Sequence, residues 1–256
     1  MLITQGLGVE MEKYLEMKNS IDIKKPLEEI YEELCSLKYS IEDKVKFCLY
    51  LNGWSSSTRP DGLKAIEDMS LFGHYLFPAG ELFLKQFGGM SIKGMRFPPW
   101  YPQKTDEISD YNYCVDIVKE VDIWEICFLE ILQTEKNELL IPIASEDRIW
   151  TVADIYLSET GKVYYCAEGQ IGIEAPDLFS YFAQIFGFVQ RLSPKNRSEV
   201  TFSEYDLLDR IEKDINQGTY MLYAQRRFAK DAGTRNVKVA DDDFTKWLFS
   251  ISKATG

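Results

Sequence analysis

A single imidazole is available for acid–base or metal chemistry, that of His74, which lies between apolar neighbours in "LFGHYLFPAG". One histidine cannot form a multi-histidine metal site, and the chain has no nucleophile-elbow motif that would pair it with a serine or cysteine. A histidine with apolar flanks is more often hydrogen-bonded inside the core than a general base. We therefore expect His74 in the core and expect no catalytic triad.

Carboxylates are abundant enough to raise the question of a metal site or a glycosidase pair. Both need carboxylates that converge in a cleft. The acidic runs fall instead on expected loops and polar helix faces, where solvated surface is the better interpretation; they comprise Asp106, Glu107 and Asp110, then Glu120, Asp122 and Glu125. The later run Asp241–Asp243 is explained by a helix N-terminus, whose dipole favours carboxylates. We expect no metal, no cofactor and no enzyme activity.

The thiols suggest neither a metal site nor a disulfide framework. The chain has five cysteines, an odd number, widely spaced and without a CxxC pair: Cys35, Cys48, Cys114, Cys127 and Cys166. Most have apolar or aromatic neighbours, which is typical of reduced, buried thiols.

A pair of glycines in "FLKQFGGMSIKG" could cradle a phosphate or simply allow the chain to turn. Phosphate loops run from a strand into a helix, whereas here a helix precedes and a strand follows. The helix end at Gly88-Gly89 is a C-terminus, where carbonyl groups repel phosphate. We therefore predict that one of these glycines ends the helix in the left-handed conformation.

The charge of the chain points to basic partners. The net charge is −12, and residues 105–150 hold twelve acidic side chains against three basic ones. Nucleic-acid binders usually carry the opposite excess. An acidic face repels nucleic acids and anionic membranes and attracts basic proteins, although it can also serve only solubility.

Hydrophobic periodicity predicts helices that bracket strands with short connections. Helical patterns cover residues 24–37, 40–54, 62–71, 79–87, 122–135 and 175–192, with Pro26 at one helix start and a capping box at Ser40 and Asp43 of another. Short apolar or alternating runs predict strands at 90–97, 111–117, 139–145, 150–158 and 162–168, the last two joined by a turn at Gly161. This order predicts an α+β fold with a mostly antiparallel sheet flanked by helices.

Three segments are expected along the chain. Residues 1–25 form an N-terminal extension, 26–192 the α+β domain, and 193–256 an appended C-terminal helical segment beyond a polar, proline-containing stretch. The start of the chain lacks the basic and apolar regions of a secretory signal, and no apolar run is long enough to span a membrane. We expect a cytoplasmic protein.

Four short motifs follow one another along the chain: a Gly-Trp element followed by an arginine (Gly53, Trp54, Arg59), "FLKQFGG" (Phe83, Leu84, Phe87, Gly88, Gly89), "PIA" (Pro142, Ile143, Ala144) and "TGKVY" (Gly161, Val163, Tyr164). Their order resembles that of the SUKH superfamily of bacterial immunity proteins, and most closely its third subgroup. Ala144 departs from the pattern, which has glycine there. The resemblance covers roughly residues 40–190.

This resemblance implies a non-enzymatic, cytoplasmic protein that binds and neutralises a cognate toxin of a polymorphic or contact-dependent toxin system, in many cases a nuclease. Some members are instead scaffold or regulatory modules with an endogenous partner, and that alternative stays open. The acidic excess of residues 105–150, which we call the acidic band, favours a basic toxin domain as the partner. We expect the contacts to come from Asp106, Glu107, Asp110, Glu120 and Glu125. Trp100 and Tyr101 are expected as aromatic anchors, with burial in the core as the alternative for both.

Overall fold

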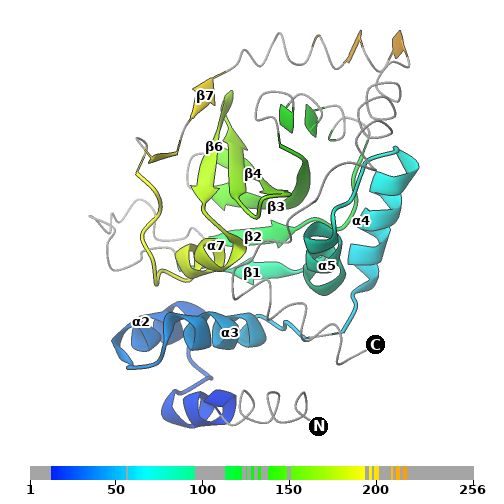
Figure 1. The fold of residues 1–256 in the computed structure, drawn as a ribbon. Helices are drawn as coiled ribbons and strands as arrows, with labels where there is room; N and C mark the ends of the chain where they lie inside the picture. Colours follow the sequence, from blue (N-terminus) through cyan, green and yellow to red (C-terminus); the bar gives the residue numbers. More distant parts are fainter. Residues whose placement is uncertain are drawn as a thin grey trace.

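The described strands form one seven-stranded antiparallel sheet, and helices flank it, as predicted (Figure 1). The computed structural model describes residues 13–55, 57–95, 113–122, 138–148, 151–193, 196–197 and 199–201, with single positions in 125–133 and 209–217. The helices are α2 (Leu27–Ser36), α3 (Ile41–Leu51), α4 (Pro60–Leu71), α5 (Pro78–Phe87) and α7 (Leu178–Ile185). The strands are β1 (Ser91–Lys93), β2 (Cys114–Ile117), β3 (Leu140–Arg148), β4 (Thr151–Ser158), β5 (Val163–Ala167), β6 (Gln170–Ala175) and β7 (Val200–Thr201).

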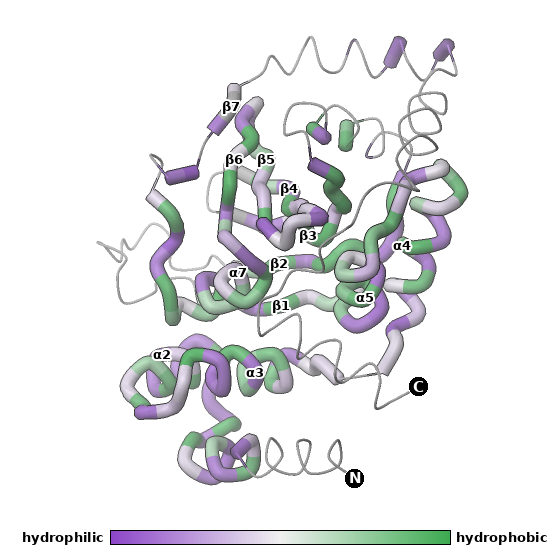
Figure 2. Tube along the Cα trace, viewed as in Figure 1, coloured by the Kyte–Doolittle hydropathy of each residue, from purple (hydrophilic) through white to green (hydrophobic). Residues whose placement is uncertain are grey.

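Local signals explain where the helices begin. Pro26 precedes α2, and the Ser40 Oγ accepts a hydrogen bond of 3.0 Å from the Asp43 N–H at the start of α3. Asp122 accepts the N–H of Glu125 in the same way, at 2.9 Å. Each cap satisfies a backbone donor that has no partner inside its own helix, so the predicted starts are confirmed. Along α2 and α3 the colour alternates between hydrophilic and hydrophobic, as one buried face per helix requires (Figure 2).

Each neighbouring pair of strands is antiparallel, and their register divides the side chains between two faces. The inner face packs against α5 and α7 and carries buried apolar residues, among them Ile92, Val115, Ile155 and Leu157. Between Pro142 and Ala144 the register of β3 shifts by a bulge. The outer face carries the residues that alternate with these.

Helices α4 and α5 lie in close contact because glycines stand where they meet. A Cβ atom on Gly62 would fall 1.8 Å from the Leu84 carbonyl oxygen, and one on Gly88 would fall 2.3 Å from the Gly62 Cα. Gly89 has a φ of +72°, which confirms the predicted left-handed helix end. The carbonyl of Gly88 accepts a hydrogen bond of 2.9 Å from the Arg59 Nε.

Motif residues that are distant in sequence therefore meet in the core. The Trp54 ring stacks on Phe87 with 5.9 Å between centroids, and Phe87 stacks on Phe83 at 4.9 Å. Gly161 occupies the hairpin turn before β5 with a φ of +89°. These residues hold helices, turn and sheet together, which accounts for their types and spacing.

The structure extends the prediction at several places. Strand β3 continues to Arg148 instead of ending at 145, and β6 and β7 were not predicted. Residues 13–20 are helical, and Met17 and Ile21 are buried in the core, although the sequence suggested only an N-terminal extension. Strand β7 lies in the polar stretch beyond residue 192, so the sheet continues past the predicted domain boundary.

His74 is buried, with its Nε2 3.0 Å from the Leu140 carbonyl oxygen. Burial lowers the pKa of His74 to about 4, so its imidazole is neutral at pH 7. Its predicted place in the core is confirmed. In the described part of the chain, no helix combines the length and apolar character needed to cross a membrane.

Candidate functional site

The predicted contact residues divide into two groups. Trp100, Tyr101, Asp106, Glu107 and Asp110 lie outside the described residues. Glu120 and Glu125 are described, and both lie between β2 and β3 in the chain. Glu120 is exposed and forms an ion pair with Lys64, whose Nζ is 3.2 Å from its Oε2. The same Nζ lies 3.0 Å from Asp68, so this corner is partly neutralised.

A row of polar residues crosses the outer face of the sheet. The register pairs Asp116 on β2 with Ser145 on β3, and Ser145 with Asp154 on β4. One step along β3, Asp147 pairs with Val152 of β4. Since neighbouring strands lie about 4.8 Å apart, Asp116 and Asp154 are roughly 10 Å from one another.

This part of the outer face is open. Asp116, Asp147 and Asp154 are all exposed, and Val152 between them is 57% exposed. We call the three aspartates the acidic sheet surface. Farther along the same face, Tyr156 is buried and its ring lies 6.4 Å from that of Phe128. The Phe128 ring therefore packs on this face at Tyr156, whereas Asp116, Asp147 and Asp154 are exposed.

Glu125 lies close enough to Asp154 of the acidic sheet surface for the two charges to interact. Burial, followed by the charges of Asp154 and Asp122, raises the pKa of Glu125 to about 7. Partial desolvation also raises the pKa of Asp154. A carboxyl group with a pKa near 7 carries a fraction of a charge that a nearby cation would complete, which makes Glu125 responsive to an approaching basic side chain.

Replacing Glu125 by glutamine should make the folded state less sensitive to pH. Because its pKa rises on folding, the unfolded chain ionises first, and the stability of the wild type falls as pH rises from about 4.5 through 7. Glu125→Gln removes this loss. The free energy of unfolding of the variant should be close to that of the wild type at pH 4.5 and should exceed it by roughly 2 to 3 kcal/mol at pH 8. Urea unfolding at both pH values measures the difference.

The matched variant for this measurement is Asp154→Asn. It removes a charge that raises the pKa of Glu125, so the pH at which stability falls should move down. An effect of Glu125→Gln that is equal at pH 4.5 and pH 8 would contradict the assignment.

Other carboxylates of the acidic band are used inside the molecule. Glu138 accepts hydrogen bonds from Lys162 at 2.7 Å and from Thr160 at 2.9 Å. Although burial acts in the other direction, these bonds lower the pKa of Glu138 below its ordinary value. Glu146 is fully buried on the inner face. Fewer acidic side chains of residues 105–150 are therefore available to a partner than the sequence suggested.

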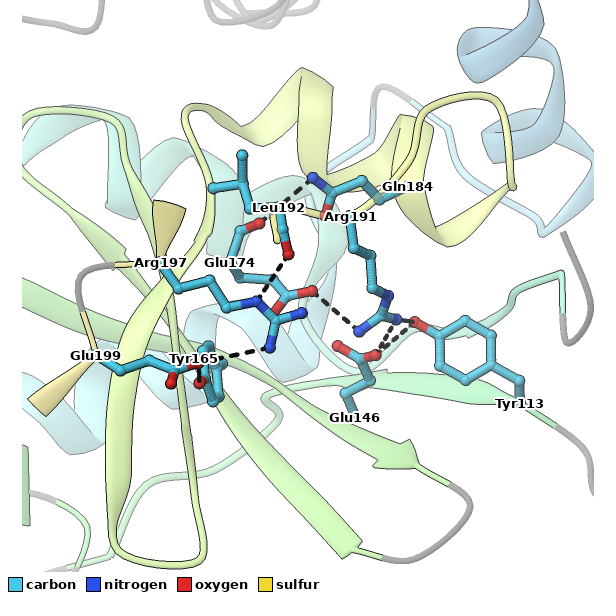
Figure 3. A network of polar contacts seen from close by, with 9 residues as sticks. All are labelled: Tyr113, Glu146, Tyr165, Glu174, Gln184, Arg191, Leu192, Arg197 and Glu199. Atoms are coloured by element: carbon cyan, nitrogen blue, oxygen red, sulfur yellow. Dashed lines mark hydrogen bonds and ion pairs between the residues drawn. The ribbon is translucent and has the colours of Figure 1, made fainter. Parts of the chain in front are cut away.

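Glu146 belongs to a buried ionic cluster that joins β3, β6 and the residues after α7 (Figure 3). The Arg191 guanidinium donates to Glu146 and, at 2.9 Å, to Glu174 of β6. The side chains of Glu146 and Glu174 are 0% and 1% exposed. The Tyr113 hydroxyl donates to Glu146 at 2.6 Å, and its ring lies 5.6 Å from the guanidinium.

Arg191 keeps its charge in this cluster. Burial alone would lower its pKa, but Glu146, Tyr113 and Glu174 raise the pKa of Arg191 well above its ordinary value. A guanidinium that bridges two carboxylates from strands three positions apart in the sheet fixes those strands to the end of α7. The cluster is thus a structural clamp.

A second polar group lies nearby on the inner face (Figure 3). The Arg197 guanidinium lies 5.2 Å from the Tyr165 ring, and its Nε donates to the Leu192 carbonyl at 3.0 Å. The Tyr165 hydroxyl donates to Glu199 at 2.5 Å. Burial and this bond raise the pKa of Tyr165 to about 12, so the hydroxyl remains a donor at neutral pH.

Burial raises the pKa of Cys35, Cys48 and Cys114, so these thiols are protonated at pH 7. Cys35, Cys48 and Cys114 are free thiols, Cys166 is buried, and Cys127 lies outside the described residues. Burial, then the charge of Asp116, raises the pKa of Cys114, which borders the acidic sheet surface, so this thiol is protonated at pH 7. Within the described ranges, no three histidine, cysteine, aspartate or glutamate side chains gather as metal ligands would.

Sequence reasoning did not single out Asp116, Asp147 or Asp154. A signal for two of them was present, because "CVDI" and "VADIYL" alternate apolar and acidic residues, as a half-exposed strand does. The meeting of the three on one face depends on strand register, which the sequence pattern leaves open. Comparison of the chain with protein-family models, with curated proteins and with solved structures finds no match.

Proposed function

We propose that this chain is a cytoplasmic immunity protein that binds a basic toxin domain and neutralises it by contact. The observation that carries the proposal is the acidic sheet surface, in which Asp116, Asp147 and Asp154 are exposed together on a rigid sheet. A binding surface on strands positions its charges better than one on loops, since the sheet holds their spacing.

Electrostatics supports a basic partner. Three carboxylates within roughly 10 Å produce a negative field that speeds the encounter with a cationic surface and disfavours anionic ones. The exposed Val152 pairs with Asp147 and offers an apolar contact beside the three carboxylates. Charged groups next to an apolar side chain suit a protein partner.

The motif order supports the same class of function. The residues that resemble the SUKH pattern, such as Trp54, Arg59 and Phe87, serve the core and the joints between elements. They would be shared by proteins of one fold whatever their partner. The acidic sheet surface lies outside those motifs, which is where partner specificity is expected.

We expect the gene immediately upstream to encode a large secreted protein with a toxic C-terminal domain, and co-expression of this chain with that domain tests the proposal. Cells that carry this chain should survive, and the two proteins should elute together from gel filtration. A chain that neither rescues the cells nor binds the domain would overturn the proposal. Capture of an endogenous protein in place of the toxin would favour the scaffold alternative.

A further inference from the structure

The chain after α7 is attached to the sheet at two places, first through Arg191 and then through Arg197 and Glu199 (Figure 3). The two attachments differ in how deeply they are buried. At the root, Arg191 is clamped between carboxylates that are 0% and 1% exposed. Farther on, residues 196–197 and 199–201, which we call the strap, are held by Arg197 and Glu199, whose side chains are 18% and 28% exposed. Ion pairs that reach solvent hold a segment less firmly than buried ones.

Among the described residues, the strap pairs with β6 over a short stretch. Strand β7 pairs with Gln170 and Ile171, and one further backbone bond runs from the Ile173 N–H to the Arg197 carbonyl at 2.6 Å. Strand β6 itself extends to Ala175. At the other end of the sheet, by contrast, the buried residue Tyr31 donates its hydroxyl to the Lys93 carbonyl at 2.8 Å.

The side chain of Asn52 completes this closure of β1 by accepting the Lys93 N–H at 2.9 Å. Tyr31 belongs to α2 and Asn52 follows α3, so side chains of the helical layer satisfy the backbone of Lys93 on β1. The β6 edge is closed by a short segment of chain. An edge strand whose cover is displaced is a template for another extended chain.

Gly172 makes room for the strap on β6. A Cβ atom at this position would fall 2.9 Å from the Glu199 Cγ and 3.2 Å from the Arg197 carbonyl oxygen. It would also fall 2.8 Å from the Tyr165 ring, whose hydroxyl binds Glu199. A side chain at position 172 would therefore force the strap or the Tyr165 ring to shift.

From this geometry we infer that the strap is a displaceable cover, and that the β6 edge binds an extended segment of a partner protein in its place. This inference rests on the proposed protein-binding function and adds a second contact to it. The partner segment pairs with β6 through its backbone, as in strand addition. Its side chains follow the strap: a basic residue over the Tyr165 ring and, two positions later, an acidic residue at the Tyr165 hydroxyl.

The spacing of two follows from the strand period, which places alternate residues on one face. Arg197 and Glu199 satisfy this spacing in the strap. The proposed occupant is thus an extended segment with an Arg-x-Glu pattern.

A labelled peptide that copies residues 196–203, "NRSEVTFS", tests the inference with the full-length chain. In the wild type the strap competes with the peptide, whereas Arg197→Gln with Glu199→Gln weakens the strap and leaves β6 unchanged. If the edge is free in a tenth of wild-type molecules or fewer, the double variant should bind the peptide at least about tenfold tighter, as measured by fluorescence anisotropy. Adding Gly172→Ala should abolish that binding.

The matched control is the same peptide carrying Arg197→Gln and Glu199→Gln, which should lose the affinity. Amide exchange provides a measurement without substitutions: the Ile173 N–H should exchange faster than the amides of Ile155 and Leu157 inside β4. Equal peptide affinity for wild type and double variant, or equal exchange rates, would overturn the inference. So would a dimer of the double variant in gel filtration, which would make a second copy the occupant.

The peptide experiment contains no toxin, so its failure leaves the rescue experiment intact. Conversely, a chain that fails to rescue cells but binds the peptide would overturn only the proposed toxin partner.

Discussion

Replacing Arg191 by methionine should lower the free energy of unfolding by about 3 to 5 kcal/mol, one of the largest losses expected for a single substitution. The methionine keeps much of the packing of the arginine stem but removes the cation that faces Glu146 and Glu174. Both carboxylates are buried, so bulk water cannot solvate them once the guanidinium is gone. Urea unfolding followed by circular dichroism measures the loss.

A triple variant separates the charge from the packing. Arg191→Met together with Glu146→Gln and Glu174→Gln removes the whole ionic cluster and leaves no buried net charge. Replacing a complete buried ion cluster by neutral groups is often close to neutral, whereas breaking it is strongly destabilising. The triple variant should therefore recover at least half of the lost stability. If it is no more stable than Arg191→Met alone, the buried carboxylates are not the cause.

Neutralising the acidic sheet surface should weaken binding of the toxin domain by about 10- to 100-fold, mostly through a slower association rate. The variant carries Asp116→Asn, Asp147→Asn and Asp154→Asn. Asp116 and Asp147 are exposed, so each of these two substitutions should change stability by no more than about 0.5 kcal/mol. Asp154→Asn also removes the charge that acts on Glu125, so it should leave the protein at least as stable at pH 7. Association rates at low and high salt measure the effect, and the salt dependence should largely disappear.

A charge-matched control identifies the location of the effect. Glu28→Gln and Glu29→Gln on α2 with Glu67→Gln on α4 remove the same number of exposed charges from helices outside the sheet. This control should bind within about threefold of the wild type if the local field decides the encounter. Equal weakening by both triple variants would show that only the net charge matters, and would contradict the acidic sheet surface as the site.

The helices were predictable because their signals are local. Pro26, Ser40 and Asp122 each mark a start through a contact within a few residues, and Gly89 ends α5 through its own backbone conformation. Strand β6 was missed because "QIGIEA" contains glycine and glutamate, which are depleted in strands. Tertiary contacts reverse that preference: Gly172 admits the strap, and Glu174 meets Arg191.

Acidic residues show the limit of the sequence most directly. Glu146, Glu138 and Asp147 belong to one acidic band, but Glu146 is buried against Arg191, Glu138 is bound by Lys162, and Asp147 is exposed. Arg191 is 45 residues from Glu146 in the chain, and Lys162 is 24 residues from Glu138. Composition could predict an excess of negative charge, and only the fold could assign each charge to the core or to the surface.

The sequence by itself determined the α+β class, the helix caps, the glycine turns and the core position of His74, since these depend on neighbours along the chain and on hydrophobic period. The tertiary structure decided which face Asp116, Asp147 and Asp154 share and which carboxylates Arg191 bridges. Strand register and long-range packing set those relations, because they bring together residues from separate strands whose contact no local pattern specifies.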